Sequence, residues 1–406
     1  MLGRSGISYG PRGYSTPRSG VFSGRPQSVL SKAFARNGVL RHIDWLLILV
    51  VCGLSALGVL LVWSATQPGL IAQGDNPHTY LEKQLLNVII GFVLMIVVTF
   101  MDSRRLRSWT PAAYGLTVLA LLAVLTPLGQ SVNGAKAWIN LPGGFQVEPS
   151  EFAKLALILA TATILSRRAG ARPGVKPLVI ALVCAAPLLG LVVIEPALGV
   201  AMVLMVAVAT MIVLSGMRLR IIAVLVAATA VVIAGAGGLH LLKSYQLTRF
   251  TSFLHPAANQ SGIGYNAAQA KIAVGSGGMF GQGLFHGQLV SGGFVPAQQT
   301  DFIFTVAGEE LGFVGAIVIV FLLGVVIVRA MRIAARADDQ FGVLVATGIA
   351  VWFAFQSFVN IGMTIGIMPI TGLPLPFLSY GGSAVFADMI AIGLLQSIHR
   401  HHSVFE

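Results

Sequence analysis

Long apolar segments separated by short polar ones recur along almost the whole chain. Ten of these segments approach the length of about 20 residues with which a helix crosses a hydrocarbon core of about 30 Å. They cover residues 44–65, 84–101, 110–128, 149–166, 177–194, 197–215, 219–239, 301–328, 341–365 and 379–398. The pattern therefore predicts an all-α fold, a polytopic membrane bundle of about ten transmembrane helices.

The Lys and Arg residues are divided unevenly between the polar segments. If the N-terminus is cytoplasmic, all but six of the 26 fall on the inner side, and the six are Lys83, Lys136, Lys154, Lys243, Arg249 and Lys271. Basic residues concentrate in the cytoplasmic loops of membrane proteins. We therefore expect both termini in the cytoplasm, and the long segment 240–300, between the seventh and eighth helices, on the extracytoplasmic side.

Composition supports this class of protein, with 56% apolar and 10% charged residues. The net charge of +12 indicates contact with anionic membrane lipids, and no nucleic-acid-binding module is recognisable. Cys52 and Cys184 both fall in predicted spans, where they pack as small apolar residues, so neither a disulfide framework nor a zinc site is expected.

The two ends of the chain are predicted to be tails on either side of a transmembrane domain over 44–398. Residues 1–43 contain no acid and are rich in Gly, Ser, Arg and Pro, a composition typical of disorder. They lack the apolar core of a cleavable signal peptide, which leaves the first span as the insertion signal. Residues 399–406 form the second cytoplasmic tail.

Two predicted outer segments, 129–148 and 240–300, are too long to be simple turns. Within the second, the run 267–274 has helical apolar spacing and predicts a short amphipathic helix at the outer interface. The glycines of 275–293 do not fit a phosphate-binding loop, because no Lys-Ser/Thr follows them and no strand precedes them. They indicate tight turns and close backbone approach.

Ionisable groups inside a membrane are costly, so each is a candidate functional group. Glu151 and Lys154 are three residues apart and share one face of a helix; a neutralising structural pair and a direct functional role are both open. Glu195 ends the fifth span, where contact with water is the simpler explanation.

Three further acids lie in the eighth span. Asp301 is expected in its first turn, where an acid commonly caps a helix. Glu309 and Glu310 lie about 12 Å further along, a depth at which adjacent carboxylates need partners or protons. A functional or conformational role and a buried hydrogen-bond network both remain open for them.

Several motifs occur together and in order. The most specific are Pro149-Ser150-Glu151-Phe152-Ala153-Lys154, Thr300-Asp301-Phe302-Ile303-Phe304 followed by Glu309-Glu310-Leu311-Gly312, and the run from Gly372 to Ser383. With these motifs the chain resembles the SEDS family (shape, elongation, division and sporulation). The run 360–372 is more similar to the RodA elongation branch than to the FtsW division branch.

The resemblance implies a peptidoglycan glycosyltransferase that polymerises lipid II at the outer face of the bacterial cell membrane with a class B penicillin-binding protein. A sugar hydroxyl must attack an anomeric carbon with a polyprenyl pyrophosphate leaving group. That reaction needs a base, cations for the pyrophosphate and an apolar groove for the lipid. A divalent cation, Mg²⁺ or Mn²⁺, is a candidate addition to the side-chain cations. The candidate substrate-binding residues are Lys136, Trp138, Glu151, Lys154, Arg249, Tyr265, Lys271 and Ser379.

The base is where the chain departs from the family. Asn259 occupies the position of the catalytic Asp, and an amide cannot accept the proton; Ala197 likewise replaces a second family acid. Three explanations are open. Asp301 or His255 takes over as base, Asn259 holds the substrate in a slowed enzyme, or the protein is a non-catalytic partner of a transpeptidase.

A lipid-linked precursor flippase is a rival function, because intramembrane charges and ten helices suit alternating access. The gathering of motifs at one face, without a clear inverted repeat, argues against it.

Overall fold

The structure, a computed structural model, describes residues 42–132, 135–140, 146–166, 175–217 and 263–404. Residues 1–41 of the predicted N-terminal tail, the seventh predicted span and residues 240–262 of the long segment before the eighth span therefore lie outside the described residues. So do three of the predicted site residues, Arg249, His255 and Asn259.

Nine of the ten predicted spans correspond to described helices. These are α2 (Trp45–Gln73), α3 (Thr79–Thr99), α4 (Ser103–Leu125), α5 (Pro149–Leu165), α6 (Val175–Ile194), α7 (Leu198–Leu214), α12 (Ile303–Arg336), α13 (Gln340–Ile365) and α14 (Gly382–Val404). Seven of the described helices are long and apolar enough to cross a membrane, while α5 and α7 have 17 residues each. The chain is thus a polytopic helical membrane protein, as predicted.

Helices α2 and α13 have clear start and stop signals. The side chains of Asp44 and Asp339 accept hydrogen bonds from the amides of Leu47 and Gly342, which caps the first turn of each helix. Both helices end at a glycine in the left-handed conformation, Gly74 with φ 78° and Gly366 with φ 81°. Helix α2 extends to Gln73, beyond the predicted end at residue 65, and its polar residues Ser64 and Thr66 are buried.

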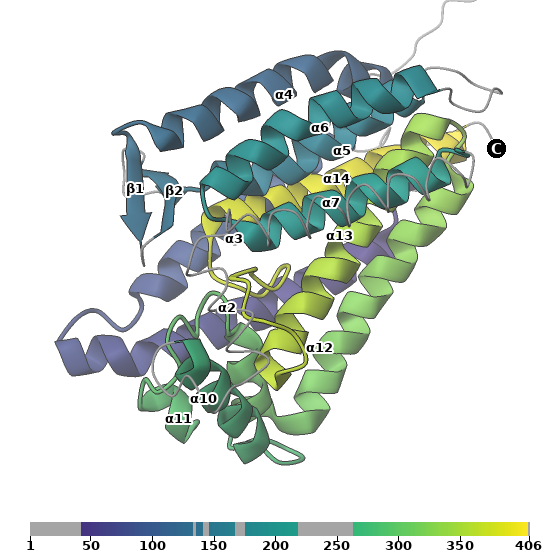
Figure 1. Cartoon of the computed structure of the whole chain (residues 1–406). Coiled ribbons are helices and arrows are strands. Elements are labelled where there is room, and N and C mark those ends of the chain that lie inside the picture. Colours follow the sequence, from purple (N-terminus) through teal and green to yellow (C-terminus); the bar gives the residue numbers. More distant parts are fainter. Residues whose placement is uncertain (1–41, 133–134, 141–145, 167–174, 218–262, 405–406) are drawn as a thin grey trace, which may run out of the picture. The chain divides into compact units, whose positions relative to one another are not determined.

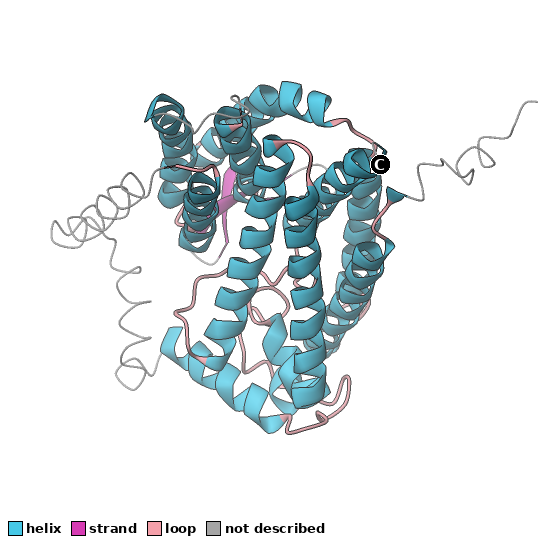
Figure 2. Ribbon diagram, turned by 90° about the vertical axis from the view of Figure 1, so that its right-hand side faces the viewer, coloured by secondary structure: helices cyan, strands magenta, loops and turns pink. Residues whose placement is uncertain are grey.

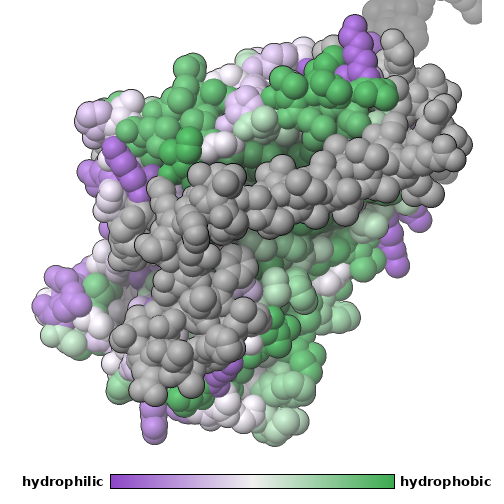
Figure 3. Space-filling view, viewed as in Figure 1, coloured by the Kyte–Doolittle hydropathy of each residue, from purple (hydrophilic) through white to green (hydrophobic). Residues whose placement is uncertain are grey.

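Helices α5, α13 and α14 form the interior of the bundle. Nearly every side chain of α5 is buried. Helix α14 packs against α3, α5 and α13; α4, α6 and α7 pack against α5, and α12 packs against α13 and α2 (Figure 1, Figure 2). Exposed apolar side chains include Leu119 of α4, Val183 of α6 and Phe321 of α12. In the view of Figure 3, hydrophobic residues cover much of the described surface. This apolar surface suits contact with lipid.

The predicted loop 129–148 contains a small antiparallel sheet that the sequence pattern does not reveal. Its strands are β1 (Gly129–Val132), β2 (Ala135–Asn140) and β3 (Gln146–Val147), in the order β1-β2-β3. Gly129 pairs with Ile139, and the register shifts between Gln130 and Ser131. The strands are short and lack a long apolar alternation, which is why the pattern predicts a loop here.

The segment before α12 contains two further helices, α10 (Ile263–Ser276) and α11 (Gln288–Ser291). Helix α10 includes the predicted run 267–274, so the helix prediction is confirmed, and it packs against α12 and α13. The glycine prediction is confirmed as well. Gly281 has φ 80°, and a side chain there would collide with the carbonyl of Glu310.

Candidate functional site

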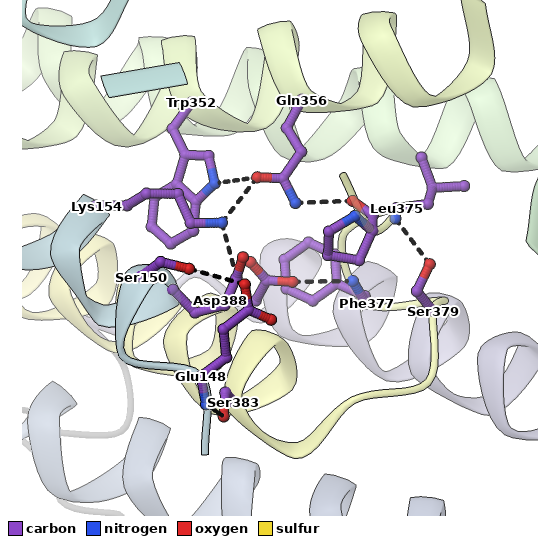
Figure 4. A network of polar contacts seen from close by, with 12 residues as sticks. Glu148, Ser150, Lys154, Trp352, Gln356, Leu375, Phe377, Ser379, Ser383 and Asp388 are labelled. Carbon is purple, nitrogen blue, oxygen red and sulfur yellow. Dashed lines mark hydrogen bonds and ion pairs between the residues drawn. The ribbon is translucent and has the colours of Figure 1, made fainter. Parts of the chain in front are cut away.

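A buried network of polar side chains joins α5, α13, α14 and the segment 366–381 that links the last two helices (Figure 4). Its centre is Lys154 of α5, whose side chain is fully buried. The Lys154 Nζ donates to Glu151 Oε2 at 2.7 Å and to Gln356 Oε1 at 2.9 Å. It also lies 4.6 Å from the ring centroid of Trp352, a cation–π contact.

Gln356 of α13 connects this cation to the linker. Its Oε1 accepts from Trp352 Nε1 at 2.7 Å as well as from Lys154, and its Nε2 donates to the carbonyl of Pro374 at 2.7 Å. One turn further along α13, Asn360 Nδ2 donates to the carbonyls of Leu373 at 2.6 Å and Asp301 at 2.8 Å. Two amide side chains therefore fix the linker to the helix bundle.

Ser379 and Asp388 hold the other end of the linker. Ser379 Oγ accepts from the amide of Leu375 at 2.8 Å and donates to the carbonyl of Thr300 at 2.6 Å. Asp388 of α14 accepts from the amide of Phe377 at 3.2 Å. The linker thereby packs against the segment that leads into α12.

Two acids lie next to this network, at the ends of α5 and α6 that are predicted to be extracytoplasmic. Glu148 precedes α5; its amide donates to Ser383 Oγ and its Oε1 accepts from Ser150 Oγ, both at 2.8 Å. Desolvation of the carboxyl group, and then repulsion by Glu151, raise the pKa of Glu148 to about 7. Glu195 follows α6; burial, and then repulsion by Glu148, raise its pKa to about 8.

Helix α12 is interrupted at Gly312, whose φ of 67° and ψ of −165° are not helical. The two amides after Gly312 donate to carbonyls of the segment 278–283, and the carbonyls of two residues before it accept from amides of the same segment, with N to O distances of 2.9 to 3.1 Å. The loop thus supplies the hydrogen bonds that one turn of α12 would otherwise make within the helix. Such partners are needed because unpaired backbone groups are costly at membrane depth.

The two adjacent glutamates of α12 bind two other elements, α11 and α2. Glu309 accepts from the amides of Leu289 at 2.7 Å and Val290 at 3.0 Å, which lie in the short helix α11. Glu310 accepts from Ser64 Oγ of α2 at 2.5 Å. These contacts form a buried hydrogen-bond network, although Glu310 Oε2 has no partner among the described residues. A functional or conformational role for the two glutamates stays a prediction.

The structure brings together only part of the predicted set of site residues. Glu151, Lys154 and Ser379 belong to the buried network. Asp301 lies close enough to Glu148 to repel its carboxylate. It precedes α12 in a turn instead of lying in its first helical turn, because the helix begins at Ile303.

The other described candidates lie elsewhere. Lys136 of β2 donates to the carbonyls of Leu125 at 3.3 Å and Thr126 at 2.7 Å, at the end of α4, and Trp138 is in the same strand. Tyr265 and Lys271 are exposed residues of α10. Which of these residues contact a substrate stays a prediction.

Sequence reasoning missed Gln356, Asn360 and Asp388. Asp388 lies within the predicted span 379–398, so the rule that marks intramembrane acids as candidates was sufficient to find it. No comparable signal marks the two amides, because Gln and Asn in an apolar helix gain significance only from partners distant in the sequence.

Comparisons with known proteins identify the family of the chain. The model of the FtsW, RodA and SpoVE family, described as "Cell cycle protein", matches residues 44–404. The chain is 37% identical to the probable peptidoglycan glycosyltransferase FtsW of Trichlorobacter lovleyi, over 88% of this chain and 93% of that protein. It is 35% identical to the peptidoglycan glycosyltransferase MrdB of Escherichia coli, over 89% and 95% of the two chains.

Solved structures agree with this placement. A chain from a peptidoglycan synthase complex that coordinates polymerization and crosslinking matches with a TM-score of 0.75 and 31% identity, over 89% of this chain and 98% of that one. The Rod shape determining protein RodA of Thermus thermophilus matches with a TM-score of 0.64 and 29% identity, over 89% and 97% of the two chains. Since relatives with FtsW and MrdB names are about equally similar, the assignment to the elongation branch stays a prediction. The chain belongs to the FtsW/RodA/SpoVE family, the SEDS family of multi-pass cell-membrane proteins.

Proposed function

We propose that the chain is a peptidoglycan glycosyltransferase that polymerises lipid II at the extracytoplasmic face of the cell membrane. The observation that carries the proposal is identity of 35% and 37%, over 88% or more of this chain, to relatives named peptidoglycan glycosyltransferases. The active face is the end of the bundle at which α5 begins and α6 ends, and the partner is a class B penicillin-binding protein. The similarity to a chain of a synthase complex that couples polymerization with crosslinking supports that partnership.

The geometry supports this assignment through the way the linker 366–381 is held. Its carbonyl and amide groups are bound by Gln356, Asn360 and Ser379, so little reorganisation is needed when charge develops beside it. Preorganised polar groups of this kind stabilise transition states. The reaction requires that a sugar hydroxyl loses its proton, that its oxygen attacks the anomeric carbon, and that the pyrophosphate leaves with the bonding electrons.

The proton acceptor is the open point, because Asn259 replaces the family's catalytic Asp and the stretch 240–300 holds no Glu and no Asp. We expect the Asn259→Asp variant to polymerise lipid II faster than the native chain, since a carboxylate restores a base at that position. Purified protein with a cognate class B penicillin-binding protein, labelled lipid II and a glycan-strand gel measure this. Equal rates for the two proteins would contradict the prediction.

The glycan gel and a transport assay with the same labelled lipid II together separate the rival functions. A non-catalytic partner binds the transpeptidase and forms no glycan in either variant. A flippase moves labelled lipid II across proteoliposomes without forming polymer. Glycan strands that depend on the chain, and that disappear when it is omitted, support the glycosyltransferase.

A further inference from the structure

Acids outnumber cations in the buried cluster that surrounds Lys154. Glu148, Glu151, Glu195 and Asp388 come from the start of α5, the end of α6 and helix α14, and Lys154 is the one cation that the described contacts place among them. Glu151 takes the direct ion pair. An excess of buried carboxylates needs a further positive charge or protons.

The excess of buried carboxylates over cations is most evident at Glu195. This side chain is 1% exposed, and neither of its carboxylate oxygens has a hydrogen-bond partner among the described residues. Buried polar atoms in native proteins are almost always paired. Glu195 lies close enough to Glu148 for the two carboxylates to repel each other, and the helices that carry them, α5 and α6, pack together. Two desolvated carboxylates at adjacent helix ends are therefore short of a counter-charge.

Lys154 of α5 and Lys136 of β2 do not supply that charge. The Lys154 ammonium is fully buried and already binds Glu151 and Gln356. The Lys136 ammonium donates to carbonyls at the end of α4. A pyrophosphate leaving group at this face would also need positive charge that these two side chains do not offer.

We propose that Glu148 and Glu195 together bind a divalent cation, of the Mg²⁺ or Mn²⁺ type, at the junction of α5 and α6. The role of this cation would be to hold the pyrophosphate of the lipid-linked sugar, and in that respect the inference rests on the proposed function. Mg²⁺ in such sites is usually bound by one or two carboxylates together with water and substrate phosphates, instead of by a full protein cage. Within the described ranges no group of three or more His, Cys, Asp or Glu residues could hold a metal ion, so the proposed site has two protein carboxylates and water completes it when no substrate is present.

The site is tested by direct binding, without lipid II and without turnover. The full-length protein in nanodiscs is titrated with Mn²⁺, and electron paramagnetic resonance measures the free ion. The native chain is expected to bind one Mn²⁺ that Mg²⁺ displaces. The Glu195→Gln and Glu148→Gln variants, which keep the side-chain shape, should bind at least about tenfold more weakly. The matched control is Glu82→Gln, which changes an exposed acid in the first turn of α3 and should bind as the native chain does.

Thermal unfolding of the same samples separates a lost site from a damaged fold. If Glu195 is a ligand, Glu195→Gln abolishes the increase in melting temperature that Mn²⁺ gives the native chain, and the metal-free variant is at least as stable as the metal-free native chain because a repulsive buried charge is gone. Native-like Mn²⁺ affinity in both variants, or no saturable binding by the native chain, would overturn the proposal and leave protons as the compensating charge.

Failure of the proposed function gives a different result. Glutamate-dependent Mn²⁺ binding by a chain that never forms glycan would contradict the glycosyltransferase and leave the cation site standing. Glycan synthesis by a chain with no such binding would overturn the cation site alone.

Discussion

At the scale of single residues, Lys154 shows how a charge is tolerated in the interior of a membrane bundle. Its ammonium group has an acid, an amide oxygen and an aromatic face as partners. An unpaired buried charge is far less stable than a paired one. The spacing of Glu151 and Lys154 predicts their ion pair from the sequence. Gln356 and Trp352 are about two hundred residues further along the chain, and no sequence periodicity relates them to Lys154.

Replacement of Lys154 by Met should destabilise the fold strongly. The substitution leaves Glu151 buried without its cation, and breaking one side of a buried ion pair typically lowers the free energy of unfolding by about 3–5 kcal/mol. Chemical unfolding in detergent micelles measures the change. The Lys154→Met/Glu151→Gln double variant removes both charges and should recover part of the loss. A double variant no more stable than the single one would show that the pair is not what Lys154 contributes.

Replacement of Ser379 by Ala tests the anchoring of the linker. The variant loses a donor to Thr300 and an acceptor for Leu375, and leaving such buried groups unpaired lowers the free energy of unfolding by about 1–3 kcal/mol. Ser55 is a matched control. It is equally buried at 2% exposure, and its hydroxyl has no partner among the described residues. Equal effects of Ser379→Ala and Ser55→Ala in the same unfolding measurement would show that the Ser379 hydrogen bonds add nothing.

At the scale of elements, the break in α12 is the feature that the hydrophobic pattern conceals. The pattern predicts one uninterrupted span over 301–328, because the residues after Gly312 are apolar and the two glutamates before it are good helix formers. The nearby glycines correctly indicate close backbone approach. Nothing in the sequence indicates that the backbone of the loop 278–283 approaches α12. The hydrogen bonds between the loop and the helix join segments about thirty residues apart.

The Gly312→Ala variant should separate the loop 278–283 from α12. The backbone of Gly312 is in a region open almost only to glycine, and an added methyl group would collide with Gly281. We expect destabilisation of about 1–3 kcal/mol and faster proteolysis within the loop. Gly324→Ala is the control, because it lies in the same helix with no atom within 4 Å of the added group. Similar cleavage of the two variants would contradict this account of the break.

At the scale of the whole molecule, the order of apolar segments is sufficient to predict the class of fold and nine of the described helices. What the sequence does not provide is the set of contacts that form the site. Asp388 and Glu195 lie in different predicted spans or at their ends. Their neighbourhoods become one site only because α5 packs against both α6 and α14. Long-range contacts of this kind leave no local periodicity, which is why the sequence reveals the motifs but not their geometry.

The orientation of the bundle is the remaining prediction on which the proposed function depends. In a background without Cys52 and Cys184, both free thiols, single cysteines are introduced as Lys271→Cys in α10 and Arg336→Cys at the end of α12. Both positions are exposed. Because basic residues concentrate on the cytoplasmic side, a membrane-impermeant maleimide should label Lys271→Cys in intact cells and Arg336→Cys only after permeabilisation. The reverse pattern would place the network around Lys154 near the cytoplasm, where it could not polymerise glycan outside the membrane.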